Sequence, residues 1–280
     1  MTNSRQQDIS RTGGSSAVLE PGAQARRLAP ARRAGAKVPE ITAWFWAAKV
    51  LTTGMGETTS DFMVHHMDPA VALGLGGCGL AASLVLQFGI RRYVPWVYWL
   101  AVVMVSVFGT MAADAVHVVL GVPYLLSAVF FLIALSVVFL LWYRSERTLS
   151  IHSVDTRRRE TFYWTVVLAT FALGTATGDL TAYSLDLGYL ASGVVFAAVI
   201  AGAGLWYWRG GLAAIPSFWF VYILTRPLGA SFADWTAASS ERGGLGWGTG
   251  PVSLGLAAGM AALVTYLSIA GKRNAPRHFS

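Results

Sequence analysis

The chain has 280 residues, of which 55% are hydrophobic and only 12% charged, and its mean hydropathy is +0.53. A soluble domain of this length carries about twice that charged fraction, so the composition excludes an ordinary soluble domain and indicates a membrane protein. The formal net charge of +7 does not indicate nucleic-acid binding, because the basic residues lie in tails and short loops. A single cysteine, Cys78, leaves no disulfide or thiolate metal site within the chain.

Residues 1–38 are rich in Arg, Ala, Gly and Ser and lack an apolar period. We therefore expect this segment to be a disordered, basic cytoplasmic tail. Pro39 and Glu40 follow, and both suit the first turn of a helix, where proline needs no hydrogen-bond acceptor and the acid meets the positive end of the helix dipole. The first span is expected to start at this point.

Eight apolar runs are long enough to cross a bilayer core of about 30 Å. The expected spans are 41–63, 69–90, 94–119, 122–143, 162–184, 187–208, 212–235 and 249–271. They predict an all-α, polytopic integral membrane protein with a single eight-helix domain over residues 39–275.

The loops between these spans differ in charge. Lys and Arg gather at the tails, at 91–92, in the loop 144–160 and at Arg209, whereas the loops on the other side contain only Arg242. Positive residues mark the cytoplasmic face. The pattern predicts a bacterial inner-membrane protein with both termini in the cytoplasm, as an even number of spans requires.

A Trp, a Gly ten residues later and an Asp five residues after that occur four times. The four sets are Trp46, Gly56, Asp61; Trp99, Gly109, Asp114; Trp164, Gly174, Asp179; and Trp219, Gly229, Asp234. This periodicity predicts four tandem two-helix repeats, about 39–92, 93–145, 158–210 and 211–272. Asp68 and Asp186 each follow the repeat aspartate by seven residues in the first and third repeats only, which suggests two duplicated four-helix halves, 36–150 and 155–275.

The segment KVPEITAWFWAAKVLTTGMGETTSD and the later tryptophan-led units resemble a family of bacterial multi-pass proteins. Members of that family consist of four tandem membrane repeats of unknown function, each with two spans and a characteristic Trp, and are often labelled uncharacterised membrane-anchored proteins. The resemblance covers residues 36–270. It implies an integral membrane protein with a repeat architecture and implies no activity, so the functional prediction rests on the residues themselves.

Fifteen helical residues place each repeat aspartate about 22 Å from its tryptophan. If the tryptophans pack at the cytoplasmic interface as anchors, the four aspartates form a layer in the outer third of the membrane. Four residues before three of these aspartates lie Glu57, Thr110 and Thr175, on the same helix faces. The glycines lie elsewhere on each helix and are expected to permit close approach of a neighbouring helix.

The acids of this layer outnumber the basic residues inside the spans, which are Lys49 and Arg226. Charged groups in a membrane interior are costly, so bound protons or a bound cation must balance the excess negative charge. Carboxylate and hydroxyl oxygens suit a hard or borderline cation such as Mn²⁺ or Zn²⁺. No resident cofactor is predicted beyond such a bound divalent cation or protons.

Two groups of residues permit alternative interpretations. His65, His66, Asp68, His117 and Asp186 lie at the outer helix ends, where they are candidate metal ligands or only polar residues at a wet boundary. Arg226, next to Pro227, is either a fixed partner for Asp234, which is favoured, or a gating counter-ion. Lys49 is either a counter-ion for the acids or extends to the cytoplasmic interface.

The sequence therefore predicts a transporter or exchanger for an inorganic cation, a proton or a divalent metal, with the lipid bilayer and the cation as its partners. The alternative is a membrane scaffold or sensor in which the repeated aspartates clamp helices together and the basic segments bind a partner or anionic lipid. An enzyme is not expected, because the sequence contains no H-E-x-x-H pair, no G-x-S-x-G turn and no phosphate-binding glycine loop.

Overall fold

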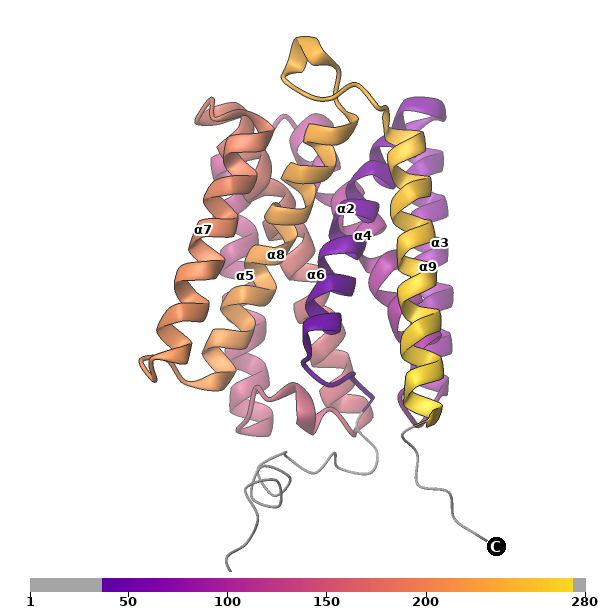
Figure 1. The fold of residues 1–280 in the computed structure, drawn as a ribbon, viewed down its shortest axis with the longest axis vertical. Helices are drawn as coiled ribbons and strands as arrows, with labels where there is room; N and C mark the ends of the chain where they lie inside the picture. Colours follow the sequence, from indigo (N-terminus) through magenta and orange to yellow (C-terminus); the bar gives the residue numbers. More distant parts are fainter. Residues whose placement is uncertain (1–36, 274–280) are drawn as a thin grey trace, which may run out of the picture. The chain divides into compact units, whose positions relative to one another are not determined.

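The computed structural model describes residues 37–273, apart from the side chains of Val118 and residues 271–273. Within that range the chain forms eight long α-helices and no β-strand (Figure 1). The helices are α2 Ala43–His66, α3 Pro69–Gly89, α4 Pro95–Val118, α5 Tyr124–Glu146, α6 Arg157–Asp179, α7 Gly188–Trp208, α8 Ala214–Ala237 and α9 Thr249–Arg273. A π-helical turn, η2 Leu180–Ser184, extends α6. The prediction of an all-α fold is confirmed.

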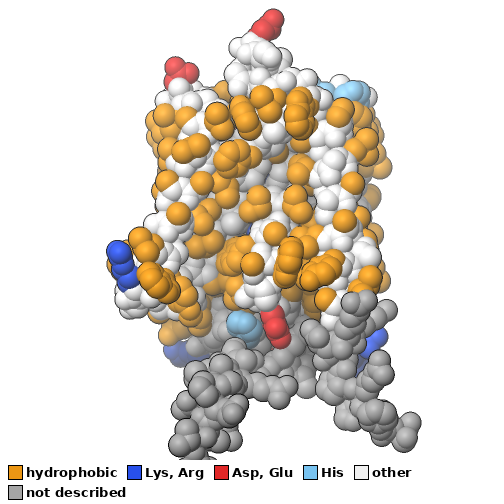
Figure 2. All heavy atoms as spheres, viewed as in Figure 1, with side chains coloured by type: hydrophobic (Ala, Val, Ile, Leu, Met, Phe, Trp, Pro, Cys, Tyr) orange, Lys and Arg blue, Asp and Glu red, His pale blue; other side chains and the backbone are white. Residues whose placement is uncertain are grey.

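Six of the eight helices are long and apolar enough to cross a membrane: α3, α4, α5, α6 with η2, α7 and α9. The other two, α2 and α8, have 24 residues each but contain the charged residues Lys49, Glu57, Asp61, Arg226 and Asp234. Figure 2 shows hydrophobic side chains over most of the visible side of the helical domain, with the charged side chains near its top and bottom and at the lower part of its left edge. These features are typical of a membrane protein.

Helices α2, α4, α6 and α8 form an inner ring, in which each packs on the next and α8 packs on α2. The outer helices pack mainly on the inner helix of the following repeat: α3 on α4, α5 on α6, α7 on α8, and α9 on α2. Consistent with this arrangement, 61% of the residues in the α4 span and 56% of those in the α6 span are buried. The corresponding share is 17 to 28% for the four outer helices. The two four-helix halves join in one ring, because α4 packs on α6 and α8 on α2.

The repeated glycines lie at the contacts of the inner ring. Each glycine faces the residue seven positions after the Trp of the next repeat, at a distance that leaves no room for a Cβ atom. The pairs are Gly56 with Ser106, Gly109 with Phe171, Gly174 with Arg226, and Gly229 with Thr53. Because the same contact passes from each repeat to the next and from the fourth to the first, the four repeats close into a ring with four-fold pseudosymmetry.

Replacing Gly56 by Ala should destabilise the protein by about 1–3 kcal/mol, because the new Cβ would overlap Ser106 of α4. Gly259→Ala on α9 is the matched control: no atom lies within 4 Å of its Cβ position, and alanine has the higher helix propensity. We expect that variant to be neutral or slightly more stable. Thermal unfolding in detergent compares the two, and equal effects would show that the ring contacts are not close-packed.

The first helix begins later than the sequence suggested. The N–H of Phe45 donates to the hydroxyl of Thr42 over 3.4 Å, and this cap places the first helical residue at Ala43. Pro39 and Glu40 precede the helix, so the expectation that they form its first turn is wrong.

The end of the predicted tail is packed against the helices. Lys37 and Val38 are buried, and Lys37 Nζ donates to Glu160 Oε2 of α6 over 2.6 Å. The other oxygen of Glu160 accepts from Gln87 Nε2 of α3 over 3.1 Å. The tail predicted for residues 1–38 is thus too long by two residues, and its remainder, 1–36, lies outside the described residues.

The repeat tryptophans pack inside the ring. Trp99, Trp164 and Trp219 are only 2 to 4% exposed and belong to an aromatic cluster with the neighbouring inner helices. The expectation that these residues pack is correct, but an anchoring position at the surface is wrong for these three. Trp44 and Trp96, each about half exposed, lie at the surface instead.

Candidate functional site

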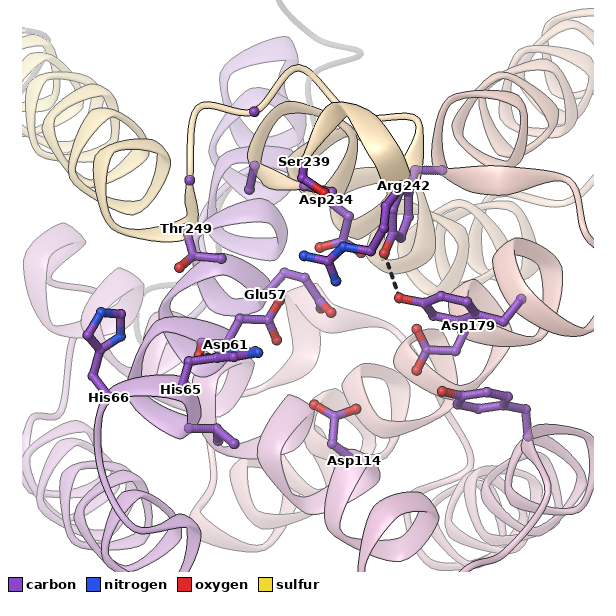
Figure 3. Close-up of a pocket in the computed structure, with 18 residues that line it drawn as sticks. Glu57, Asp61, His65, His66, Asp114, Asp179, Asp234, Ser239, Arg242 and Thr249 are labelled. Atoms are coloured by element: carbon purple, nitrogen blue, oxygen red, sulfur yellow. Dashed lines mark hydrogen bonds between the residues drawn. The ribbon is translucent and has the colours of Figure 1, made fainter.

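A cavity of about 600 Å³ lies at the end of the inner ring where α2, α4 and α8 end and α6 passes into η2. We call it the vestibule and define it by its acidic lining, which is Glu57, Asp61, Asp114, Asp179 and Asp234. Figure 3 shows these five side chains directed toward the same space. Each of the four inner helices thus contributes one repeat aspartate.

The repeat explains why the aspartates meet. The inner helices run in the same direction and share one register, which the glycine contacts fix. Residues at equal distances from the four tryptophans therefore reach the same height in the ring. The close helix contacts lie one turn below, and the space between the helices widens at the aspartates.

None of the four aspartate carboxylates forms a hydrogen bond or an ion pair with another residue between 37 and 273. All four side chains are partly exposed to the vestibule. A buried acid that clamps two helices needs a donor on the second helix. The geometry therefore leaves these carboxylate oxygens available to a ligand.

Three of the acids lie close enough to share one ion. Oxygen atoms of Glu57, Asp61 and Asp234 all lie within 4.8 Å of one another. Asp114 and Asp179 line the other side of the vestibule and do not join this group. Carboxylate oxygens in such an arrangement are the ligands preferred by hard divalent cations.

Arg226 forms the floor of the vestibule. Its side chain is fully buried, and Nη2 donates to Glu57 on α2, Thr110 on α4 and Thr175 on α6. One guanidinium therefore joins all four inner helices. The favoured pairing of Arg226 with Asp234 is wrong, because the guanidinium pairs instead with Glu57 on the neighbouring helix α2.

The same contacts change the role expected for the two threonines. Thr110 Oγ1 donates to Ser106 O over 2.9 Å and accepts from Arg226, and Thr175 Oγ1 donates to Phe171 O over 3.1 Å and also accepts from Arg226. Neither hydroxyl lines the vestibule. The expectation that Thr110 and Thr175 offer oxygens to a cation is therefore wrong.

Lys49 lies below this floor and is only 1% exposed. Its Nζ has no hydrogen-bond partner among the described residues and lies 4.0 Å from the ring centre of Phe171 and 4.4 Å from that of Tyr222. The side chain therefore does not extend to the interface. It is also separate from the acids of the vestibule, so it is not their direct counter-ion.

Of the outer polar residues predicted as metal ligands, His65 and His66 line the vestibule, and His65 lies beside the acids. Its Nδ1 lies 2.6 Å from the carbonyl oxygen of Asp61 and must donate to it, which leaves Nε2 free to accept a hydrogen bond or bind a metal. Figure 3 shows the His65 ring extending beside Asp61 into the vestibule and the His66 ring pointing away. His66 instead stacks on Phe62.

The remaining predicted metal ligands have other roles. The carboxylate of Asp68 caps α3 by accepting from the N–H groups of Ala70 and Val71, and His117 bonds to Val122 O and stacks on Tyr124. Asp186 adopts a positive φ of 54° in the turn before α7 and does not line the vestibule. These three residues do not join His65 in a metal site, so that expectation is wrong for them.

The lining residues that were not predicted as part of the site include Tyr124, Tyr183, Tyr189 and Arg242. Tyr183 and Tyr189 share a hydrogen bond between their hydroxyls, and Tyr183 stacks on Tyr124. Tyr183 follows Asp179 by four residues, a spacing that places both on one helix face. Arg242 comes from the loop after α8. It is the only Lys or Arg in the outer loops, and this isolated charge was the feature of the sequence that could have indicated its place in the site.

Comparison with known proteins agrees with the internal repeat. Residues 44–93, 97–148, 162–211 and 217–273 each match the family described as Repeat of Unknown Function (DUF347). The chain belongs to this family. No curated protein and no solved structure matches it.

Each DUF347 match covers one inner helix and the outer helix that follows it. The four repeats share the Trp, Gly and Asp positions but differ in the polar residues near the floor: Glu57 and Lys49 occur only in the first repeat, and Arg226 only in the fourth. The four aspartates are therefore related by the repeat, whereas the polar residues of the floor below them are not.

Proposed function

We propose that this DUF347 protein is an integral membrane transporter or exchanger for an inorganic cation, a proton or a divalent metal such as Mn²⁺ or Zn²⁺. The observation that carries the proposal is the vestibule, where four repeat aspartates without partners face one cavity and three carboxylates converge within 4.8 Å. Its acids outnumber its basic residues, Arg226 and Arg242, so a bound cation stabilises the site electrostatically.

In this proposal all eight helices span the inner membrane of a bacterium, with both termini in the cytoplasm and the vestibule open to the outside. The 24 residues of α2 and of α8 give about 36 Å of helix, enough to cross the hydrocarbon core. Their charged side chains face the ring interior, where the other helices shield them from lipid. The excess of Lys and Arg at the opposite end supports the orientation.

The route toward the cytoplasm is closed below the vestibule. Arg226 with its three partners fills the ring axis, and the aromatic cluster around Tyr98, Tyr163 and the repeat tryptophans lies beneath it. An open cavity on one side and a packed barrier on the other are the features of a transporter in its outward-facing state. Transport then requires Glu57 and Arg226 to separate.

The scaffold alternative gains less support from the geometry. It assigns the aspartates to helix clamping, whereas the side-chain hydrogen bonds that join the inner helices come from Arg226 and from the hydroxyls of Tyr98 and Tyr163. The four aspartates make no such bonds among the described residues. A transport role rather than an enzymatic or purely structural one therefore fits the site best.

The test is cation flux into proteoliposomes that contain the full chain. We expect Mn²⁺ or Zn²⁺ uptake by the wild type and at least a tenfold loss in Asp61→Asn, with a smaller loss in Asp114→Asn, which lies outside the three-carboxylate group. Asp186→Asn is the control, because it makes the same chemical change outside the vestibule and asparagine tolerates a positive φ. Equal flux in Asp61→Asn and the wild type would overturn the proposal.

A further inference from the structure

An arginine side chain enters the vestibule from the loop that follows α8. Arg242 lines the cavity, and Figure 3 shows its guanidinium pointing into it on the side of Glu57 and Asp234. Its charge acts on Asp61 of α2 and on Tyr189 of α7. Yet its side chain forms no hydrogen bond or ion pair with the acids in the described part of the chain. Arg242 is therefore a positive charge held among carboxylates but not bound to any of them.

The loop fixes the backbone of Arg242 at the mouth of the vestibule. Four consecutive N–H groups of the loop donate to carbonyl oxygens at the end of α8 over 2.7 to 3.1 Å: Leu245 to Trp235, Gly246 to Ala238, Trp247 to Thr236 and Gly248 to Ala237. Helix ends leave such carbonyl groups without partners inside the helix, so these bonds attach the loop to α8. Gly244 lies so close to this helix end that a Cβ atom would be 2.2 Å from the carbonyl oxygen of Ala238. Only the side chain of Arg242 remains free to rotate.

Arg242 therefore contributes a permanent charge to the vestibule. Arginine keeps its charge at physiological pH, and the loop keeps it at the mouth when a cation arrives. The aspartates attract an ion in proportion to its charge, and Arg242 repels the ion in the same proportion. A ring of aspartates alone would bind the most highly charged ions most strongly, and the arginine offsets part of this preference.

We propose that Arg242 is a specificity-determining residue, which weakens the binding of trivalent cations to the vestibule more than the binding of divalent ones. This inference rests on the proposed function and narrows its substrates to cations of low charge. The role needs the charge of Arg242 and no contact between the guanidinium and the ion. The alternative is a structural role, because Arg242 also borders an apolar cavity beside Leu187 and Leu190 at the start of α7.

Isothermal titration calorimetry of the full chain in detergent tests this role with Mn²⁺ and Tb³⁺ as the probes. Arg242→Met removes the charge and keeps a long side chain that can pack at the start of α7. We expect it to bind Mn²⁺ about tenfold and Tb³⁺ about thirtyfold more tightly than the wild type, because the lost repulsion is proportional to the ion's charge. Arg242→Lys keeps the charge, so its affinity for both ions should stay within about threefold of the wild type.

Two comparisons separate charge from packing. At an ionic strength of about 1 M the gain in Arg242→Met should largely disappear, because the screening length falls to about 3 Å. Arg209→Met is the matched control, since it removes the same charge at the other end of α7, about 30 Å along the helix from the vestibule. We expect this control to change the affinity for either ion by less than about twofold.

The outcomes distinguish the two proposals. If the wild type binds Mn²⁺, then unchanged affinities in Arg242→Met, equal gains for the two ions, or gains that persist at high salt overturn the role of Arg242. Each of these results leaves cation transport standing. A wild-type protein that neither binds nor transports any cation overturns the proposed function and this inference with it. If Arg242→Met does not fold, Arg242→Gln gives the same comparison, because it also removes the charge.

Discussion

Arg226→Met should lower the free energy of unfolding by about 3 kcal/mol, the largest stability effect that we expect from a single substitution in the ring. Arg226 is fully buried and its Nη2 donates to Glu57, Thr110 and Thr175 on three different helices. Removing the guanidinium leaves Glu57 without its partner and two threonine hydroxyls without a donor. Because Glu57 borders the vestibule, water can reach it, and the loss stays near the lower end of the range for broken buried pairs.

A double variant separates charge from packing. Glu57→Gln combined with Arg226→Met removes both charges, so we expect it to recover more than half of the stability lost in the single variant. Arg158→Met is the matched control, because that arginine is 69% exposed beside Glu146 and should change stability by less than about 0.5 kcal/mol. A detergent unfolding series measures all three. An Arg226→Met protein as stable as the control would show that the floor does not hold the ring together.

The sequence predicts those features of the architecture that depend on a single helix. The Trp–Gly–Asp spacing fixes the height of each aspartate along its own helix, and the length of each apolar run sets the approximate extent of each helix. The predicted spans therefore agree with α2 to α9 to within a few residues, apart from the start of α6, and the aspartates meet as expected. The glycine contacts follow from the same repeat, since small residues mark close helix approaches.

The rest depends on how repeats pack against one another, which spacing along a single helix does not specify. The inner ring closes through the contact between α8 and α2, and this contact brings Arg226 from the fourth repeat to Glu57 of the first. Local spacing instead favoured Asp234, two turns away on the same helix. Tertiary contacts between distant segments likewise place Lys37 on Glu160 and bury it.

The roles of the outer polar residues could not be predicted from the sequence either. Asp68 and His117 are residue types that commonly bind metals, but here their side chains form hydrogen bonds with backbone groups at helix ends. That role depends on where the helices stop. The tyrosines of the vestibule come from the starts of α5 and α7 and from η2, and no repeat marks them. Only the fold brings Tyr124 and Tyr189 to the aspartates, whereas the spacing of Tyr183 from Asp179 places these two on one helix face.

The proposed cation site requires that four carboxylates from parallel helices share one water-accessible cavity. Its most direct test is cysteine accessibility in a Cys78→Ser background, which removes the single native cysteine. Cysteine replaces Asp61, Asp114, Asp179 or Asp234, one at a time, and intact proteoliposomes are treated with a cationic, membrane-impermeant thiol reagent. Leu132→Cys on the outer face of α5, where the native side chain is 53% exposed, is the control.

We expect all four cysteines to react from the same side of the membrane, at least tenfold faster than Leu132→Cys, because water and cations reach the vestibule but not the hydrocarbon-facing surface. Zn²⁺ should slow the reaction at Asp61→Cys, where the remaining carboxylates still attract the ion. Cysteines that react from opposite sides, or no faster than the control, would contradict a shared cavity and with it the proposed cation site.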